Sequence, residues 1–294
     1  MLTVSVVIPT YKNRGGLINS IDSVLNQNSP NIIEIIIVDD NEPESLERKS
    51  TENLMKKYEG NLLVRYLKHE HNKNGAAARN TGIFSSKGDL VAFLDDDDIF
   101  LPHKIEKQVS FLEDNNQYDA VYCFERKQGV KTDTTIHQGN ATCDILLLKS
   151  NFQTSTLVFR RHVLIALNGF DESFTRHQDV EIMLRFYQEN FKLGCVPDVL
   201  VEMGKNNGEN IPKGDKLEKL KSSFFDKFMS QIEAQDRIQP GFKNKVLAVH
   251  YAGVFLSHMK NGFYKKALSI LFQYYLKSPS TFNNLVMSHI KNHL

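Results

Sequence analysis

The stretch GDLVAFLDDDDIF, residues 88–100, places four consecutive aspartates, Asp95 to Asp98, directly behind a run of apolar, strand-forming residues. Like charges at this spacing repel one another, so the folded chain has to offset their repulsion. In open α/β sheets, ligands bind beyond the carboxyl ends of the strands. The stretch therefore predicts a buried strand that delivers carboxylates to a ligand-binding edge.

Three similar apolar runs precede it, namely VSVVIP at 4–9, IIEIIIVDD at 32–40 and LLVRYL at 62–67. Continuous apolar runs of this length predict strands that are buried on both faces, as in parallel sheets. Helical patterns fill the intervals, at 15–28, 45–60 and 75–86. This alternation predicts an α/β fold with a mostly parallel central sheet flanked by helices.

Beyond residue 100 the pattern is less regular. It predicts helices at 103–116 and 178–190, strands near 119–124 and 155–160, and a helical C-terminal region from about residue 215. Charge divides the chain in a similar way: residues 1–204 hold 22 Lys and Arg against 29 Asp and Glu, and residues 205–294 hold 14 against 6. A net charge of −7 followed by one of +8 indicates two regions with different partners.

Composition excludes several classes of protein. The chain of 294 residues is 41% hydrophobic and 24% charged, and it contains no apolar run long enough to span a bilayer. We expect a cytoplasmic protein, because the N-terminus lacks a secretory leader and the three cysteines suit reduced thiols. The lysines are not interleaved with aromatic residues as in a nucleic-acid module, so we expect no nucleic-acid partner.

Polar residues follow three of the predicted strands, namely Pro9, Thr10 and Tyr11, then Asp39 and Asp40, then Asp95 to Asp98. No G-x-G-x-x-G follows the first strand and no P-loop motif occurs, which argues against dinucleotide and P-loop sites. Carboxylates suit a hard divalent cation that bridges to phosphate oxygens. The edge therefore predicts a metal ion, and through it a nucleotide diphosphate.

Simpler interpretations of the aspartates remain. A calcium loop is disfavoured, since Ile99 stands at a ligand position and Phe100 where the loop needs glycine. The run could also be a solvated charged patch, and Asp39 with Asp40 could be turn residues.

The ordered set of motifs resembles the family 2 glycosyltransferases of bacterial surface-glycan type, which are inverting enzymes with the GT-A fold. The resemblance covers about residues 3–200 and rests on VSVVIPTYKN, EIIIVDD, NKNGAAARNTGI, GDLVAFLDDDD and NGFDESFTRHQDVEIMLRF. It implies a catalytic domain over residues 1–212, with a nucleotide-sugar half at about 1–100 and an acceptor half at about 101–212. A basic helical region would occupy residues 213–294.

On the donor side, the resemblance implies a nucleotide-sugar site. Pro9, Thr10 and Tyr11 would line the pocket for the base. Asp39 would accept a hydrogen bond from the base, with Arg79 nearby.

Asp95 and Asp97 match the family's D-x-D motif. Asp95 would lie by the ribose, Asp96 would contribute to the nucleotide-sugar site, and Asp97 would ligate Mn²⁺ or Mg²⁺. Asp179 matches the catalytic base at the start of a helix, and would take the proton from the acceptor hydroxyl.

Two positions depart from the family pattern. Gln178 stands where many relatives have glutamate. Many relatives also supply a histidine metal ligand after the base region, whereas the corresponding stretch here, residues 201–210, has none. We expect His69 and His71 to be exposed loop residues, and His177 to be at most an acceptor contact.

The resemblance implies transfer of a sugar from a nucleotide-diphospho-sugar, with a UDP-sugar as first guess, to a hydroxyl of a glycan or lipid-linked acceptor. A catalytically inactive nucleotide-sugar-binding scaffold is the first alternative, and a sugar nucleotidyltransferase the second. The basic C-terminal helices have two interpretations as well. They are either a cap with its lysines in water, or a face that rests on the anionic inner surface of the membrane. The oligomeric state stays open.

Overall fold

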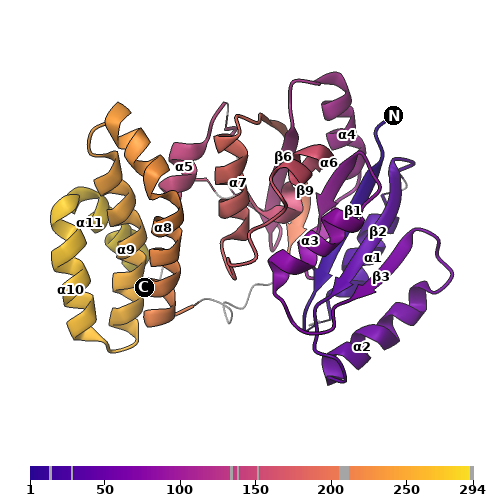
Figure 1. The fold of residues 1–294 in the computed structure, drawn as a ribbon, viewed down its shortest axis with the longest axis horizontal. Helices are drawn as coiled ribbons and strands as arrows, with labels where there is room; N and C mark the ends of the chain where they lie inside the picture. Colours follow the sequence, from indigo (N-terminus) through magenta and orange to yellow (C-terminus); the bar gives the residue numbers. More distant parts are fainter. Residues whose placement is uncertain are drawn as a thin grey trace. The chain divides into compact units, whose positions relative to one another are not determined.

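The computed structural model describes residues 1–12, 15–27, 29–132, 135–137, 139–150, 152–204 and 212–291. The chain forms two compact units (Figure 1): residues 1–141 with 151–205, and residues 142–150 with 206–294. The boundary expected at residue 212 stays a prediction, since residues 205–211 lie outside the described ranges.

The first unit is built on a mixed sheet. Its described strands follow the order β3-β2-β1-β4-β8-β6-β9-β5, and β7 pairs with β6. They are β1 (Val4–Thr10), β2 (Ile32–Asp39), β3 (Val64–Lys68), β4 (Leu90–Phe93), β5 (Ile99–Phe100), β6 (Ala120–Lys127), β7 (Val130–Lys131), β8 (Val158–Arg160) and β9 (Leu193–Met203).

The predicted parallel pairing of the first four strands is confirmed, within a sheet that also holds antiparallel pairs. Strand β1 pairs in parallel with β2 and with β4, and β2 pairs in parallel with β3. Strand β8 is antiparallel to both β4 and β6, so β6 runs in the same direction as β4. The carboxyl ends of β1, β4 and β6 therefore reach the same edge of the sheet.

Helices pack on both faces of this sheet (Figure 1). Those of the first unit are α1 (Leu17–Leu25), α2 (Leu46–Met55), η1 (Lys56–Tyr58), α3 (Gly75–Ser85), α4 (Lys104–Asp114), η2 (Thr154–Thr156), α6 (Arg161–Ala166) and α7 (Gln178–Gln188).

Strand β1 shows how the two faces are divided. Val6 and Ile8 point into the main core, which also holds apolar residues of α1 and α4. Val7 points to the other face, where α3 packs so closely that an added methyl group on Gly82 would stand 2.3 Å from a Val7 methyl. Because successive side chains of a strand alternate between faces, one apolar run serves two layers of helices.

Several elements of the first unit were not predicted, among them β5, β7 and α6. The fourth strand ends at Phe93, so the aspartates lie in the loop beyond it. Strand β9 was not predicted, because Gly194, Pro197 and Asp198 interrupt its apolar residues. It forms a strand because it pairs with β6, which is distant from it in the sequence.

The second unit is helical, as predicted. Its elements are α5 (Thr142–Leu146), α8 (Asp215–Ile238), α9 (Phe242–Lys260), α10 (Tyr264–Tyr274), η3 (Tyr275–Lys277) and α11 (Pro279–Lys291). Ala248, Ala252 and Phe282 form a buried cluster that joins α9 to α11. Among the described residues, no helix is both long enough and apolar enough to cross a membrane.

Candidate functional site

The four aspartates fold into a tight loop in which each carboxylate has a different environment. The backbone N–H of Asp98 donates to the carbonyl oxygen of Asp95 at 3.0 Å, which closes the turn. Asp95 and Asp96 are partly buried, Asp97 is exposed and Asp98 is buried. The four carboxylates of the loop therefore differ in how far they are buried, and each has its own neighbours.

Asp95 forms an ion pair with Arg79, which projects from α3. Arg79 also donates from Nη1 to Oε1 of Gln178 at 2.7 Å, and Gln178 begins α7. The backbone N–H of Asp95 donates to the hydroxyl of Ser155 at 3.1 Å. Arg79 therefore holds the aspartate loop and the start of α7 together.

Asp96 is held by the end of β1. The hydroxyl of Thr10 donates to its Oδ2 at 2.5 Å. Burial, together with the neighbouring charges of Asp95 and Asp97, raises the pKa of Asp96 to about 7, against the opposing effect of the hydrogen bond from Thr10. Protonation of this carboxyl near neutral pH reduces the repulsion within the loop.

Asp98 is only 2% exposed. The hydroxyl of Ser155 donates to its Oδ2 at 2.6 Å, and the backbone N–H of Gly204 donates to its Oδ1 at 2.8 Å. Burial raises the pKa of Asp98 to about 8, with a further contribution from the charge of Asp95. Asp98 thus ties the loop to η2 and to the end of β9.

Two glycines leave room for Asp97. A methyl group added to Gly16, just before α1, would stand 2.8 Å from the Cα of Asp97. One added to Gly204 would stand 2.4 Å from the carbonyl oxygen of Asp97 and 2.7 Å from its Cγ. Side chains at either position would therefore displace the exposed carboxylate.

The residues present fit a divalent cation. Asp95 and Asp97 both raise the pKa values of Asp96 and Asp98, so negative potential is concentrated in the loop. A cation near Asp97 would relieve that potential, and carboxylate oxygens are the ligands that Mn²⁺ and Mg²⁺ prefer. Residues 205–210 of the stretch without histidine lie outside the described residues, so the full ligand set stays open.

Asp179 lies in the first turn of α7, next to Gln178. Burial raises its pKa, while the charge of Arg79 lowers it and that of Asp95 raises it. Gln178, the residue before Asp179, accepts from Arg79, and Arg79 pairs with Asp95, which places the start of α7 beside the aspartate loop. The structure thus brings together Thr10, Arg79, Asp95, Asp96, Asp97 and Asp179, although their roles stay predictions.

The other residues predicted for the base pocket differ from one another in how far they are buried. Pro9 and Thr10 end β1, and Tyr11 follows with 47% of its surface exposed. Asp39 is fully buried: Asn41 donates to its Oδ1 at 2.9 and 2.8 Å, and its Oδ2 receives the Tyr66 hydroxyl and pairs with Arg48. A hydrogen bond from a base to Asp39 would have to replace one of these contacts, so that role stays a prediction.

His69 is buried, and the expectation of an exposed loop residue is wrong. Its Nδ1 lies 2.7 Å from Asp40 Oδ1, and its Nε2 lies 2.8 Å from the hydroxyl of Thr81. Asp40 also accepts backbone N–H bonds from Lys73 and Asn74, both at 2.9 Å. Together these contacts fix the segment before α3, and hence the position of Arg79. The sequence held no signal for this, because the partners are far apart along the chain.

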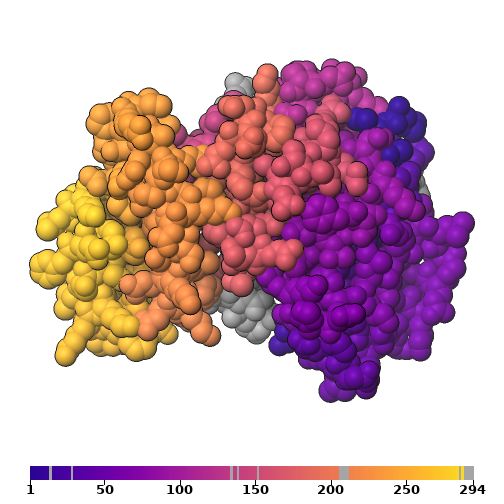
Figure 2. Space-filling model, in the orientation of Figure 1, coloured from indigo at the N-terminus to yellow at the C-terminus, as the bar shows by residue number. Residues whose placement is uncertain are grey.

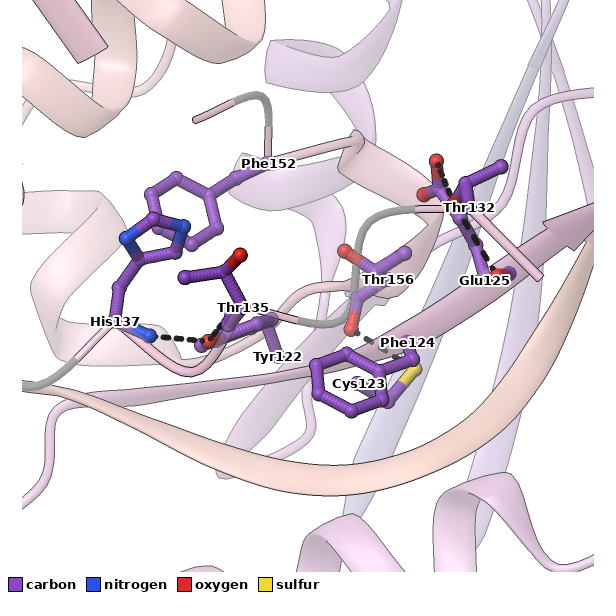
Figure 3. A pocket seen from close by; sticks show the side chains of 9 residues that line it. All are labelled: Tyr122, Cys123, Phe124, Glu125, Thr132, Thr135, His137, Phe152 and Thr156. Atoms are coloured by element: carbon purple, nitrogen blue, oxygen red, sulfur yellow. Dashed lines mark hydrogen bonds between the residues drawn. The ribbon is translucent and has the colours of Figure 1, made fainter. Parts of the chain in front are cut away.

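A small cavity lies against the middle of β6 (Figure 3). Tyr122, His137 and Phe152 gather on one side, with ring centroids 5.0 Å apart for Tyr122 and Phe152 and 5.4 Å for His137 and Phe152. Its volume of about 40 Å³ has room for roughly two or three waters, too little for a sugar ring. The cavity reaches Thr156 of η2, whose neighbour Ser155 holds Asp98.

Sequence reasoning missed the residues that position the aspartates. These are Gly16, Ser155, Gln178 as the acceptor for Arg79, and Gly204. Only Gln178 carried a signal, as a departure from the family pattern. The others are small residues, two glycines and the η2 serine Ser155, whose role depends on which atoms approach them.

Known proteins are similar to this chain in sequence and in fold. Residues 5–176 match the model of the family described as Glycosyl transferase family 2. The amylovoran biosynthesis glycosyltransferase AmsB of Erwinia amylovora is 30% identical over 210 residues, which cover 68% of this chain and 68% of AmsB. The poly(ribitol-phosphate) beta-N-acetylglucosaminyltransferase TarP of Staphylococcus aureus is 38% identical over 117 residues, 40% of this chain and 35% of TarP.

The fold is similar to that of TarS from S. aureus, solved as residues 1–349 in complex with UDP-GlcNAc. The TM-score is 0.63 at 16% identity, with 99% of this chain and 92% of the TarS chain covered. The chain spans only 15% to 62% of the length of three other curated glycosyltransferases that it matches. The family model covers more than half of the chain, and the chain therefore belongs to glycosyl transferase family 2, with the GT-A fold.

Proposed function

We propose that the protein is an inverting glycosyltransferase that moves N-acetylglucosamine from UDP-GlcNAc to a hydroxyl group of a teichoic-type or polysaccharide acceptor. The observation that carries the proposal is the aspartate loop, which stands at the carboxyl edge of the sheet, is held by Thr10 and Arg79, and lies near Asp179. That edge is where ligands bind in open α/β sheets.

The choice of donor is supported by relatives. TarS was solved with UDP-GlcNAc and with UDP, and TarP is named for transfer of N-acetylglucosamine to poly(ribitol phosphate). AmsB, which matches more of this chain, is named for amylovoran biosynthesis. These names support a polymeric surface glycan as acceptor.

Asp179 is the proposed general base. Its raised pKa makes it a stronger base than an exposed carboxylate. It takes the proton of the acceptor hydroxyl while that oxygen forms a bond to the anomeric carbon. The bond from the anomeric carbon to the diphosphate breaks on the opposite face, so the configuration inverts in one displacement.

Asp97 is the proposed ligand of Mn²⁺ or Mg²⁺, and Asp95 is proposed to lie by the ribose of the donor. When bound, the cation neutralises charge on the departing diphosphate. Arg79 keeps Asp95 in place through its ion pair, and Gln178 orients Arg79 beside Asp179. Thr10 and Asp98 fix the remainder of the loop.

The test is the release of UDP from UDP-GlcNAc with Mn²⁺ present, with and without a ribitol-phosphate polymer as acceptor. We expect UDP and no pyrophosphate. Asp179→Asn should abolish release while keeping donor binding, and Asp97→Asn should remove the Mn²⁺ dependence. Asp114→Asn, on the exposed end of α4, is the matched control and should leave both unchanged.

Other outcomes select the alternatives. Pyrophosphate in place of UDP would identify a nucleotidyltransferase. Donor binding without UDP release, with or without acceptor, would identify a nucleotide-sugar-binding scaffold. Binding itself is seen as thermal stabilisation, because a ligand at a hundred times its dissociation constant adds about 2.7 kcal/mol to the free energy of unfolding.

A further inference from the structure

Helix α10 and the turn η3 carry a row of exposed, large apolar side chains in the second unit. Tyr264, Leu268, Phe272 and Leu276 follow one another at intervals of four residues, and their exposed fractions are 60%, 52%, 74% and 71%. Residues four apart lie on the same side of a helix. The four side chains, called here the α10 row, therefore form one continuous apolar ridge.

The ridge is not needed to hold the helix in place. The opposite side of α10 carries Ala267 and Ile270, which are 0% and 4% exposed. Tyr274 stacks on Tyr251 of α9, with ring centroids 3.8 Å apart. Helix α10 thus packs on α9 through its inner side (Figure 1), and the α10 row faces outward.

Lysines accompany the α10 row. The exposed Lys265 directly follows Tyr264 on α10, and the exposed Lys260 and Lys277 stand just before and just after the row in the sequence. Beyond Asp236 the sequence has no acidic residue, while seven lysines follow. An apolar ridge among cations complements a surface that is anionic outside and apolar beneath, and lysine stems can lie along such a boundary with the ammonium in water.

A second copy of the chain is a poorer partner for the same surface. In a symmetric contact the same patch meets itself, so the lysines of one copy would face those of the other. Like charges across an interface oppose binding. Phosphate headgroups at the interface of a bilayer carry the opposite charge.

We propose that the α10 row docks the protein on an anionic phospholipid surface, with α10 and η3 lying in the plane of the interface. The segment from Tyr264 to Leu276 extends about 20 Å, which is too short to span a bilayer but typical of a surface helix. Such docking would bring a transferase to acceptors anchored in the membrane. The docking itself does not depend on the proposed sugar transfer.

The experiment measures co-sedimentation of the full chain with vesicles, without donor or acceptor. Vesicles of phosphatidylcholine with about one third phosphatidylglycerol should bind the protein, and pure phosphatidylcholine should bind it much more weakly. Phe272→Ser with Leu276→Ser should lower the affinity roughly a hundredfold, because two apolar side chains lose their burial. Lys265→Gln should lower it about fivefold.

The matched control is Leu46→Ser with Leu62→Ser in the first unit, which removes two leucines that are 83% and 97% exposed. It should bind vesicles as the wild type does. Thermal unfolding checks that every variant is folded. The proposal is overturned if the wild type does not bind anionic vesicles, or if the control weakens binding as much as the α10 variant. It is also overturned if light scattering shows wild-type oligomers that the α10 variant dissociates while vesicle binding stays unchanged.

Discussion

Gly204→Ala tests whether the close approach of Gly204 to Asp97 positions the site. The added methyl group would stand 2.4 Å from the carbonyl oxygen of Asp97 and 2.7 Å from its Cγ. Relaxed contacts between such atoms are about 3.5 Å, so Asp97 has to move by roughly 1 Å. The neighbours are backbone and a short side chain that is itself part of the tight loop, so no flexible end can move aside.

The expected magnitudes follow from this displacement. A misplacement of about 1 Å at a reacting group lowers the rate about a hundredfold. Overpacking lowers the free energy of unfolding by about 1–3 kcal/mol. We therefore expect Gly204→Ala to remain folded, to release UDP from UDP-GlcNAc about a hundredfold more slowly, and to lose most of its stabilisation by UDP with Mn²⁺.

The assays are UDP release and thermal unfolding, with Gly253→Ala as the matched control. Gly253 lies within α9, exposed, and an added methyl group would meet no atom within 4 Å. Alanine there should raise the free energy of unfolding by about 0.5–1 kcal/mol through helix propensity and leave the rate unchanged. If folded Gly204→Ala protein released UDP at the wild-type rate, Asp97 would not need the position that Gly204 permits.

Three further predictions concern the groups around the loop. The pKa of Asp98, about 8, lies above its ordinary value, so the folded protein loses stability as pH rises from about 4 to 8. In EDTA, Asp98→Asn should be more stable than the wild type at pH 8 by about 5 kcal/mol and similar at pH 4. Equal melting temperatures at pH 8 would contradict this. Burial lowers the pKa of the fully buried Lys104 to about 8. The cost of burying its charged form therefore lowers stability below pH 8, and this cost fades as pH rises towards 10. Lys104→Met should raise the free energy of unfolding at pH 7 by ~2 kcal/mol, with a smaller gain in a thermal melt at pH 10. Gln178→Ala removes the hydrogen-bond acceptor that lies 2.7 Å from Arg79, so the rate of UDP release should fall about tenfold. An unchanged rate would show that Arg79 needs no partner besides Asp95.

The contacts of the aspartate loop explain how the fold reduces the repulsion among four adjacent carboxylates. Asp95 has a cationic partner, Arg79, and the pKa values of Asp96 and Asp98 rise to about 7 and about 8, so both groups carry less than a full charge near neutral pH. Asp97 is the exposed member. The charge that remains at neutral pH is thus concentrated where a cation could approach from solvent.

The sequence by itself determined the class of fold and the family. Four apolar runs with helices between them specify a parallel sheet, since their periodicity depends only on neighbouring residues. The order of the motifs then identified the edge of the sheet at which Thr10 and Asp39 end their strands and the aspartates follow β4. Strand β9 escaped prediction because its pairing with β6, rather than its own pattern, makes it a strand.

Only the tertiary structure decided how the site is held together. Gly16 and Gly204 approach Asp97 from segments almost two hundred residues apart, and Gln178 meets Arg79 across a separation of 99 residues. His69, expected to be exposed, is buried against Asp40 and Thr81. The outward direction of the α10 row was likewise undecided by sequence, because the helix has apolar residues on both sides and packing against α9 selects which side is covered. Such contacts join residues distant along the chain, and no local pattern records them.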